Sequence, residues 1–334
     1  MNPVALSEYS QIHNALSPSV DTLRNKSILI TGATGLIGSY LVNFLNYLNT
    51  LHDFNINIYA TSTGAHKLSA RFAGYKNTHF IVHDFTTPFS SDIAFDYIIH
   101  AASPADPQSF VSHPVETMLT NIIGTQSLLE HIRQYGGHML YLSSGEIYGN
   151  TQDSAATEND FGSIDTKTSR ACYPESKRAS EALCASYIAQ YDLHVNIARL
   201  CYIYGASITD TSNRADADFL RHAINHTDIV LNSPCTQRRT YCYIADAVSG
   251  ILHILLHSQS GDVFNIANPE SITTLYNYAK ILADLAGIKV IAPAPDNRIV
   301  SNSVLDASKL IQSGWTPHYN LQDGLSNTLK QSLK

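Results

Sequence analysis

The sequence predicts an α/β protein built on a doubly wound parallel sheet, with a smaller subdomain towards the C-terminus. Strand-like and helix-like segments alternate along residues 27–205, which is the pattern of a parallel sheet covered by helices on both faces. At the start of this region a short apolar stretch runs into three glycines spaced by three. Beyond residue 205 the alternation loosens into shorter elements. The chain has 334 residues and exceeds the usual size of a single core, so two subdomains or one enlarged domain are expected.

The expected strands are short segments rich in apolar or β-branched residues. They are Ile28–Thr31, Asn55–Thr61, Thr78–His83, Tyr97–Ala101, His138–Ser143, His194–Ile203 and Val263–Ala267. An amphipathic segment, Ser39–Leu48, predicts the helix that follows the first strand. The segment Pro114–Tyr135 carries apolar residues at helical spacing, and Pro114 suits the first turn of a helix. Pro174–Tyr191 is a further expected helix.

The shorter C-terminal elements are expected to form the smaller subdomain. They are Asp228–Leu231, Thr240–Ile244, a helix from Asp246, a helix from Thr273 to Ala286 and a last helix near the C-terminus. Two stretches lack periodicity, 150–171 and 206–213, and both are rich in Thr, Ser, Asp and Asn. Loops of that length in a compact domain are usually functional lids or binding loops, and a disordered surface excursion is the alternative.

The three glycines follow the first strand directly, at positions 32, 35 and 38. Gly32 and Gly35 would let the backbone approach a pyrophosphate without an intervening Cβ, and Gly38 would let the new helix pack against its strand. Because the glycines stand between a strand and a helix start, they predict a dinucleotide site and a Rossmann-type sheet. A glycine-rich turn without a ligand is the alternative.

Charge and cysteine content exclude several classes of function. The formal net charge is −7, from 21 basic and 28 acidic residues, so no nucleic-acid partner and no membrane surface are expected, and a polyanionic substrate must be met by local arginines. The five cysteines are odd in number and form no C-x-x-C pair, which argues against disulfides and against a metal site and favours a reducing cytoplasm. Residues 1–26 are expected to be neither a signal nor a transit peptide. No apolar run approaches the ~20 residues that span a bilayer.

A second chemical feature is the pair Tyr173 and Lys177, one helical turn apart. A free tyrosine titrates near ~10. A nearby ammonium group favours the phenolate, so Tyr173 is expected to accept a proton near neutral pH.

The chain is expected to divide into three parts. They are an N-terminal extension (1–26), a dinucleotide-binding Rossmann domain that carries the catalytic residues (27–205) and a mainly substrate-binding subdomain (206–334), whose late segments return to the core sheet.

These motifs together resemble the extended short-chain dehydrogenase/reductase family of NAD-dependent epimerases and dehydratases. The resemblance rests on the three glycines, on the strand end Ser143-Ser144-Gly145-Glu146-Ile147-Tyr148-Gly149 and on the Tyr173/Lys177 pair. Flanking segments sharpen it, among them 100–105, 170–173, 237–239 and 243–246. They are most similar to UDP-glucuronate decarboxylases, with 4,6-dehydratases and 4-epimerases close behind. The similarity spans roughly residues 27–325.

The resemblance implies a transient 4-keto sugar that is formed and consumed on a nucleotide-sugar substrate. Tyr173 would take the hydroxyl proton, Lys177 would hold the nicotinamide ribose and Ser144 would hydrogen-bond the reacting oxygen. Glu146 would act as general acid or base in the second step, and a salt bridge or cap is its alternative role. The implied substrate-binding residues are Ser103, Ser144, Glu146, Tyr202 and Arg239.

The cofactor implied is NAD, with NADP also possible. The implied cofactor-binding residues are Gly32, Thr34, Gly35, Leu36, Ile37, Thr61, Ser62, Asp84, Phe85, Ala101, Ala102, Ser103, Asn121, Tyr173 and Lys177. NAD users carry an acidic residue at the end of the second strand, where this chain has Thr61. Without a carboxylate there, a 2′-phosphate is admissible.

Two further departures bear on the reaction. Tyr202 stands where the family usually places an asparagine that touches the substrate, which leaves the sugar open. Family 4,6-dehydratases carry an aspartic acid between the serine or threonine and the glutamate, where this chain has Gly145. A glycine cannot donate a proton, so decarboxylation, epimerisation or reduction is expected rather than loss of water.

Three functions remain open from the sequence. The first is a decarboxylase or epimerase of nucleotide sugars, the second is an NADP-dependent nucleotide-ketosugar reductase, and the third is a non-catalytic dinucleotide-binding regulator. A regulator has no need to keep Ser144, Tyr173 and Lys177 together, so the enzyme is favoured. Family members commonly form dimers through two helices per subunit, and a homodimer is expected here through Pro114–Tyr135 and Pro174–Tyr191.

Overall fold

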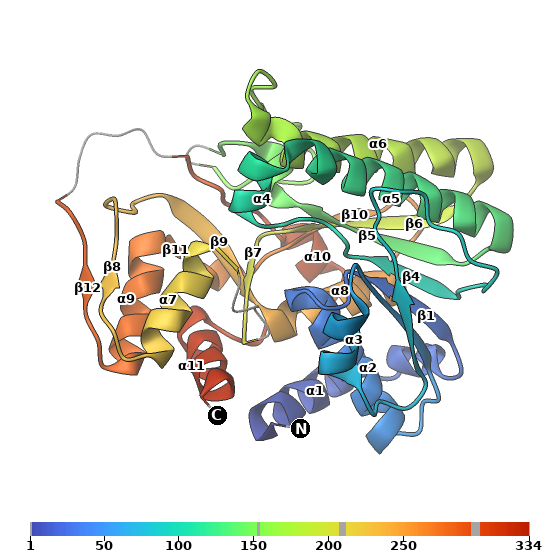
Figure 1. The fold of residues 1–334 in the computed structure, drawn as a ribbon, viewed down its shortest axis with the longest axis horizontal. Helices are drawn as coiled ribbons and strands as arrows, with labels where there is room; N and C mark the ends of the chain where they lie inside the picture. The colour runs from blue at the N-terminus through green and yellow to red at the C-terminus, as the bar shows by residue number, and fades with distance from the viewer. Residues whose placement is uncertain (1, 152–153, 207–211, 295–300, 334) are drawn as a thin grey trace.

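A seven-stranded parallel sheet organises the protein, in the computed structural model that describes residues 2–151, 154–206, 212–294 and 301–333 (Figure 1). The strands run in the order β10-β6-β5-β4-β1-β2-β3, so the chain winds outwards in both directions from β1 and β4. This is the strand order of the Rossmann fold with one strand added, as the sequence predicts. The strands are β1 (Ser27–Thr31), β2 (Asn57–Ser62), β3 (Thr78–Val82), β4 (Tyr97–His100), β5 (His138–Ser144), β6 (His194–Leu200) and β10 (Val263–Ile266).

Helices cover both faces of this sheet. On one face lie α4 (Pro107–Ser112), α5 (Pro114–Tyr135) and α6 (Cys172–Tyr191), with α5 and α6 packed side by side (Figure 1). On the opposite face lie α2 (Leu36–Leu51) and α8 (Ile244–His257). The inner strands are buried from both sides and rich in apolar residues, and Ile28, Leu29 and Ile30 of β1 are fully buried, whereas the edge strand β3 exposes Phe80 and Val82.

The two longest predicted helices form where expected, and their ends follow local rules. Helix α5 has Pro114 in its first turn and ends at Gly136, whose φ of +78° only glycine adopts easily. Helix α6 ends at Asp192 in the left-handed conformation. A short helix, α3 (Ala65–Phe72), packs beside β2 and β3.

The N-terminal extension is itself folded onto the body. It forms α1 (Pro3–Leu16) and a 3₁₀ turn, η1 (Ser19–Leu23). Helix α1 buries Tyr9, Ile12 and Leu16 and packs against α8, α2 and the last helix. These buried positions follow a helical period within a segment whose average composition is polar, and such a pattern was the available signal for the helix.

The C-terminal part forms two small sheets covered by helices. One sheet contains β7 (Tyr202–Tyr204), β9 (Arg238–Tyr243) and β11 (Ile272–Thr274), and the other pairs β8 (Ile229–Val230) with β12 (Val290–Ile291). The helices are α7 (Ala215–Ile224), α9 (Leu275–Ala286), α10 (Ser308–Gln312) and α11 (Leu321–Ser332). Short 3₁₀ turns complete the described elements: η2 (Gly145–Tyr148), η3 (Ser169–Ala171) and η4 (Pro269–Ser271).

Two predicted elements differ from the structure. The segment expected as one strand, His194–Ile203, is divided at Cys201, because β6 pairs with the large sheet whereas β7 pairs with β9. The segment Thr273–Ala286 begins as strand β11 and becomes helical only after Thr274, whose side chain accepts a hydrogen bond from Asn277 N. Helix α7 was not expected.

The two long loops have different outcomes. Within 150–171 the described residues cross to the C-terminal part, where Ala156 bridges Leu305, and the loop ends in η3. The loop expected at 206–213 lies mostly outside the described residues. No helix in the described ranges is both long and apolar enough to span a membrane.

Candidate active site

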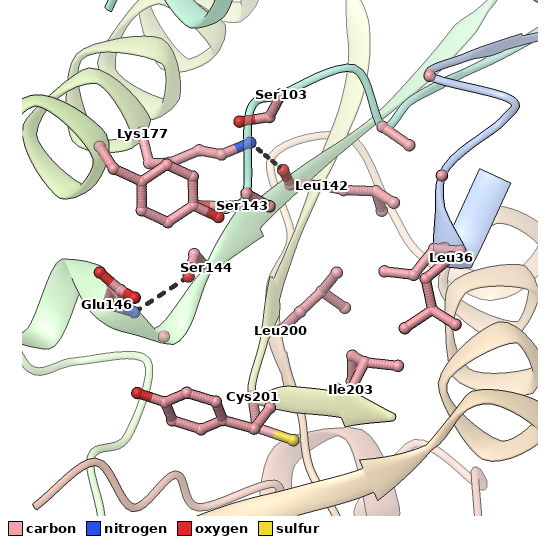
Figure 2. Close-up of a pocket in the computed structure, with 18 of the residues that line it drawn as sticks. Leu36, Ser103, Leu142, Ser143, Ser144, Glu146, Lys177, Leu200, Cys201 and Ile203 are labelled. Carbon is pink, nitrogen blue, oxygen red and sulfur yellow. Dashed lines mark hydrogen bonds between the residues drawn. The ribbon is translucent and has the colours of Figure 1, made fainter. Parts of the chain in front are cut away.

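A cavity of about 230 Å³ opens at the carboxyl ends of β1, β4 and β5. This is where the strand order reverses, and open α/β sheets bind their ligands at that point. Its wall combines the glycine turn, the end of β5, the start of α6 and, from the C-terminal part, Arg214 and Ser303. Figure 2 shows Lys177, Ser144 and Glu146 on one side of the cavity and Leu36 on the other.

The glycine turn leaves no room for side chains at two of its positions. A Cβ on Gly32 would lie 2.9 Å from the Ala101 oxygen, and the φ of Gly32 is +64°. A Cβ on Gly38 would lie 2.4 Å from the Gly32 oxygen, so α2 packs directly on the turn. Gly35 is the N-cap of α2, and the free N–H groups of this helix end face the cavity edge. A helix N-terminus with a bare backbone is suited to a phosphate group.

A hydrogen-bond network fixes the end of β4 beside this turn. The Thr31 hydroxyl accepts from the backbone N–H groups of Ala101 and Ala102, and lies 2.8 Å from Nδ1 of His100. Burial lowers the pKa of His100 to about 3, so its ring is neutral. The Thr31 hydroxyl therefore donates to Nδ1, and Nε2 carries the ring proton.

Several buried polar atoms at this edge of the sheet lack a partner among the described residues. They are Thr61 Oγ1, His100 Nε2, Ser103 Oγ and Ser143 Oγ. Buried polar groups in native proteins are nearly always hydrogen-bonded, so unpaired ones at a cavity indicate ligand contacts. Neighbouring Thr34 and Ser62 hydrogen-bond each other at 3.0 Å.

The remaining predicted cofactor residues lie around the cavity rather than in its wall. Asp84 is exposed and accepts from the N–H of Thr86, whereas Phe85 is buried against Gly124. Asn121 on α5 is buried and donates to Ser176 Oγ of α6, so it holds the two helices together. These side chains support the cavity from outside.

Lys177 and Tyr173 lie on the cavity side of α6, and both are buried. The Lys177 ammonium donates to the Leu142 oxygen at 2.7 Å (Figure 2). It lies 5.8 Å from the centroid of the Tyr173 ring. Burial lowers the pKa of Lys177 to about 7, and the charge of Glu181 works in the opposite direction.

The expectation of a tyrosine phenolate near neutral pH needs correction for this structure. Burial, followed by the negative charge of Glu146, raises the pKa of Tyr173 to about 12. The Lys177 ammonium is directed at a backbone oxygen, and its own charge is weakened by burial. Spacing along the helix placed Tyr173 and Lys177 correctly, but it carried no information on burial.

Ser144 and Glu146 flank Gly145 at the end of β5. The Ser144 hydroxyl accepts from the backbone N–H of Glu146 at 3.2 Å, which caps the turn η2 (Figure 2). A Cβ on Gly145 would lie 2.7 Å from Cδ1 and 2.8 Å from Cδ2 of Leu305. Leu305 is 2% exposed and therefore occupies the space that a side chain at position 145 would need.

The carboxylate of Glu146 forms an ion pair with Arg170 at 2.6 Å. The Arg170 guanidinium also lies 4.6 Å from the ring centroid of Phe110, and Phe110 stacks on Tyr173 with centroids 4.6 Å apart. Phe110 belongs to α4, which covers this side of the cavity. Sequence reasoning missed Phe110, since nothing in the spacing of α4 marks it.

Three residues of the C-terminal part face the same cavity region. The Arg239 guanidinium lies 4.4 Å from the ring centroid of Tyr202, so the two predicted substrate residues are in contact. Arg214 lines the cavity, pairs with both oxygens of Asp216 and donates to the Ile203 oxygen. Arg214 was missed because it follows an aperiodic loop, where no motif distinguishes it from a surface arginine.

The structure brings most of the predicted site residues into one cavity wall. Those that line it are Gly32, Gly35, Leu36, Ile37, Ala101, Ser103, Ser144, Glu146, Tyr173, Lys177 and Tyr202. Those outside the wall are Thr34, Thr61, Ser62, Asp84, Phe85, Ala102, Asn121 and Arg239. Within the described ranges, no group of three or more His, Cys, Asp or Glu side chains could hold a metal ion.

Sequence comparisons with known proteins agree on one family. A sequence model of the NAD dependent epimerase/dehydratase family matches residues 28–267. A curated relative, UDP-glucuronic acid decarboxylase 6 of Arabidopsis thaliana, is 31% identical over 307 residues, which is 90% of this chain and 87% of the relative.

Solved structures share the fold at lower identity. A UDP-glucose 4-epimerase from Thermotoga maritima, solved with UDP-glucose, has a TM-score of 0.76 and 22% identity and covers 91% of this chain and 97% of its own. A UDP-glucose 4-epimerase from Thermus thermophilus, solved with NAD, has a TM-score of 0.73 and 22% identity over 91% of this chain and 97% of its own.

Proposed function

This chain belongs to the NAD-dependent epimerase/dehydratase family of nucleotide-sugar-modifying enzymes, and from that premise we propose that it is a decarboxylase or epimerase that works through a transient 4-keto sugar. One observation carries the proposal. The side chains of Ser144, Tyr173 and Lys177 line the same cavity as the glycine turn, so a proton acceptor and a dinucleotide cradle share one space.

The cradle fits NAD or NADP on geometric grounds. Gly32 and Gly38 cannot carry a Cβ, the N-terminus of α2 is bare, and the hydroxyls of Ser103 and Ser143, which line the cavity, have no partner among the described residues. The dinucleotide, when bound, would supply hydride acceptance and return. NAD is favoured by the family and by the NAD in the Thermus thermophilus epimerase structure.

The side chains of this chain would handle the proton. Ser144 would hydrogen-bond the sugar oxygen and Tyr173 would take its proton, with the positive charges of Arg214 and Arg170 favouring the phenolate. Lys177 would bind the ligand while it keeps its bond to the Leu142 oxygen, since its ammonium has three donors and only one is used by that bond.

The second step follows from what stands at position 145. Leu305 fills the space beside Gly145, so the turn after β5 offers one carboxyl group, that of Glu146. Elimination of water needs an acid for the leaving hydroxyl as well as a base. Decarboxylation needs no such acid, because carbon dioxide leaves a β-ketoacid unaided, and epimerisation needs none either. These two reactions are therefore proposed.

The test is to identify the dinucleotide retained by purified protein and then to screen UDP-, dTDP-, GDP- and CDP-linked hexoses and uronic acids by mass spectrometry. Loss of the mass of carbon dioxide from a uronic acid, or an isomer of unchanged mass, is the expected result. Rapid loss of the mass of water from a hexose would refute the argument from Gly145. Failure to turn over any of these sugars, with a dinucleotide bound, would favour the regulator.

One observation keeps a reductase as a second candidate. The end of β2 presents Thr61 and Ser62 rather than a carboxylate, so a 2′-phosphate would meet no repulsion from this strand. A net NADP-dependent reductase would consume the reduced cofactor in proportion to product. Incubation of a nucleotide-linked ketosugar with NADPH decides, because a reductase oxidises NADPH in proportion to product whereas a redox-neutral enzyme returns its hydride within one turnover.

We further propose that the chain forms a homodimer through α5 and α6. Val115, Met118 and Leu119 are apolar, lie on α5 and are at least one-third exposed. Apolar side chains along an exposed helix favour a protein partner. A molar mass of one chain at micromolar concentration, measured by analytical ultracentrifugation, would rule out this dimer.

A reducing cytoplasm remains the proposed compartment. All five cysteines lie in described ranges and are free thiols, and four of them are buried. Proteins of oxidising compartments commonly use such residues in disulfides. Localisation of a tagged chain tests this assignment.

A further inference from the structure

Two proposed acid–base groups of the same sign share this cavity. In the reaction proposed above, Tyr173 must be a negative phenolate before it takes the sugar proton, and the carboxylate of Glu146 is already negative when it acts as a base. Like charges in one site oppose each other's ionised forms. The charge of Glu146 does act against ionisation of Tyr173 in this structure. A site that uses both groups therefore needs a nearby cation that offsets the two negative charges.

We propose that Arg170 is a positioning residue that lets the Glu146 carboxylate and the Tyr173 phenolate carry negative charge in the same site. This deepens the proposed function and rests on it. Arg170 lies three residues before Tyr173, in η3, at the end of the aperiodic loop 150–171. Its Nη2 donates to Oε2 of Glu146 at 2.6 Å.

The position of Arg170 is fixed by a stack of three groups. Its guanidinium lies over the ring of Phe110 at 4.6 Å, and Phe110 is parallel to Tyr173 within 22° at a centroid distance of 4.6 Å. A guanidinium over an aromatic face is held by cation–π attraction. Phe110 therefore contacts both Arg170 and Tyr173, and it holds the guanidinium where it also reaches Glu146.

The other charged groups around Tyr173 make different contacts from Arg170. The titratable side chains that face Tyr173 from the elements packed on it are Tyr141, Glu146, Arg170, Cys172, Lys177 and Arg214. Arg214 also favours the Tyr173 phenolate, but it is paired with both oxygens of Asp216. Lys177 donates to the backbone oxygen of Leu142. Of these cations, Arg170 is the one that directly neutralises Glu146.

The exposure of the pair limits the size of the effect. The Arg170 side chain is 49% exposed and that of Glu146 is 26% exposed, so water screens part of their interaction. An opposite charge within about 4–6 Å shifts a titration by one to three units, and because Phe110 separates Arg170 from Tyr173, the effect on Tyr173 is about one unit at most.

The experiment measures ionisation at position 173 without turnover. A difluorotyrosine, whose phenol is more acidic than that of tyrosine, is incorporated at position 173, and its ionisation is followed by fluorine NMR. Arg170→Gln should raise the midpoint by about one pH unit. Arg170→Lys keeps the charge and should restore more than half of this shift. Arg178→Gln is the matched control, because Arg178 pairs with Glu175 on the same helix at the surface.

A double variant tests whether Arg170 acts through Glu146. If the two charges balance, Glu146→Gln alone should lower the midpoint, and the double variant Glu146→Gln/Arg170→Gln should return it to within half of the Arg170→Gln shift from the parental value. An unchanged midpoint in Arg170→Gln, or a double variant shifted as far as Arg170→Gln, would overturn the proposal. If Arg170→Gln does not fold by circular dichroism, Arg170→Met keeps the contact with Phe110 and is held to the same outcomes. Because no substrate is needed, absence of turnover rejects only the proposed function.

Discussion

One oxygen atom separates Tyr173 from a phenylalanine, and in the proposed reaction that oxygen accepts the proton of the sugar hydroxyl. Tyr173→Phe should reduce kcat/KM by ~100-fold or more, the usual scale for loss of a general base. The ring and its stacking on Phe110 remain, so the fold and the dinucleotide site should be retained. Kinetics on the substrate found by the screen give the rate, and calorimetry with the dinucleotide is the control. A variant as fast as the parent would remove Tyr173 from the mechanism.

Position 145 offers a test that needs no substrate. Gly145→Ala would place a Cβ 2.7 Å from Leu305, so it should lower the free energy of unfolding by about 1–3 kcal/mol, the usual cost of overpacking. In a Leu305→Ala background the space is open, and the same change should cost less than about 0.5 kcal/mol. Chemical denaturation of the four proteins measures the coupling. Equal costs in both backgrounds would show that Leu305 does not exclude a side chain at this position.

At the scale of single residues, the sequence could predict groups that lie within a motif and not those that reach the site from a distance. Tyr173 and Lys177 follow from their spacing along a helix, whereas Ser144 and Glu146 follow from the resemblance of the strand end to a known family. Phe110, Arg214, Ser303 and Leu305 enter the site through tertiary contacts between segments far apart in the chain. No local spacing encodes such contacts, and no local spacing encodes the burial that raises the pKa of Tyr173.

The strand–turn–helix from β1 to α2 is the element that the proposed dinucleotide site depends on. Gly35 caps α2, and even an added Cβ there would lie 3.3 Å from the Gly32 oxygen. Gly35→Val should therefore abolish dinucleotide binding, because a branched side chain would project where the phosphates approach the helix end. Gly64→Val is a matched control, since Gly64 caps the short helix α3 and has open space around it. Calorimetry measures both, and unchanged affinity in Gly35→Val would exclude this turn as the cradle.

Two histidines, at the first positions of β5 and β6, should make the stability of the protein depend on pH. His138 and His194 stack with centroids 3.8 Å apart, and His138 Nε2 lies 2.7 Å from Asn196 Oδ1. Burial, followed by the charge of His194, lowers the pKa of His138 from 6.5 to about 4. Between these values the unfolded chain binds a proton that the native protein does not bind, so stability is lost as the pH falls from 6.5 to 4.

His138→Gln removes this contribution. The parental protein should lose more free energy of unfolding than the variant over that window, by about 3 kcal/mol at most. Because parent and variant share all other titrating groups, the contributions of those groups to the pH dependence cancel in the comparison. One of them is Asp246, whose pKa is raised by burial to about 7 and whose contribution to stability therefore rises as the pH falls. His66→Gln, at an exposed position, should lose as much free energy of unfolding between pH 6.5 and 4 as the parent does. Parallel pH profiles for parent and His138→Gln, measured by urea denaturation, would contradict the assignment.

At the scale of elements, hydrophobic pattern predicted the strands of the large sheet because each is rich in apolar or β-branched residues, including the exposed edge strand β3. It failed at Cys201, since an unbroken β-prone run does not show that its two halves join different sheets. It also missed α7 and α1, where the helical period is carried by few apolar residues among many polar ones. Tertiary packing, rather than local propensity, decides such segments.

Across the whole molecule, the C-terminal part closes the proposed site from outside the Rossmann sheet. Arg214, Arg239 and Leu305 come from segments after residue 206, while β10 returns to the edge of the large sheet beside β6. The sequence predicted this return through a late apolar segment, Val263–Ala267. The boundary at residue 205 stays a prediction, because the chain crosses between the two parts several times.

A buried carboxylate on the N-terminal helix joins both parts. Glu8 is 1% exposed and accepts hydrogen bonds from Tyr40 of α2 at 2.9 Å and Tyr243 of β9 at 2.7 Å. Asn327 and Gln331 of α11 donate to it as well, at 3.1 Å each. Four donors from three separate elements therefore meet on one side chain of a segment that the sequence presented only as an extension.

Removing this side chain should destabilise the whole molecule. Glu8→Ala leaves two buried tyrosine hydroxyls without their acceptor, at a cost of about 1–3 kcal/mol each, so the free energy of unfolding should fall by about 3 kcal/mol or more. Asp21→Ala, which breaks an exposed ion pair with Arg24 in the same segment, should change it by less than about 1 kcal/mol. Denaturation monitored by circular dichroism measures both, and a similar small loss in each variant would mean that α1 is only loosely attached.

Glu8→Gln separates the hydrogen bonds from the charge. Burial raises the pKa of Glu8, so the native protein binds a proton more readily than the unfolded chain, and the parent gains stability relative to the glutamine variant as the pH falls through this raised pKa. At neutral pH the buried charge is costly, and glutamine keeps one acceptor oxygen for the tyrosines. Glu8→Gln should therefore be milder than Glu8→Ala at pH 7 and should fall further behind the parent at pH 5. A gap between parent and Glu8→Gln that narrows on acidification would show that Glu8 is not held with a raised pKa.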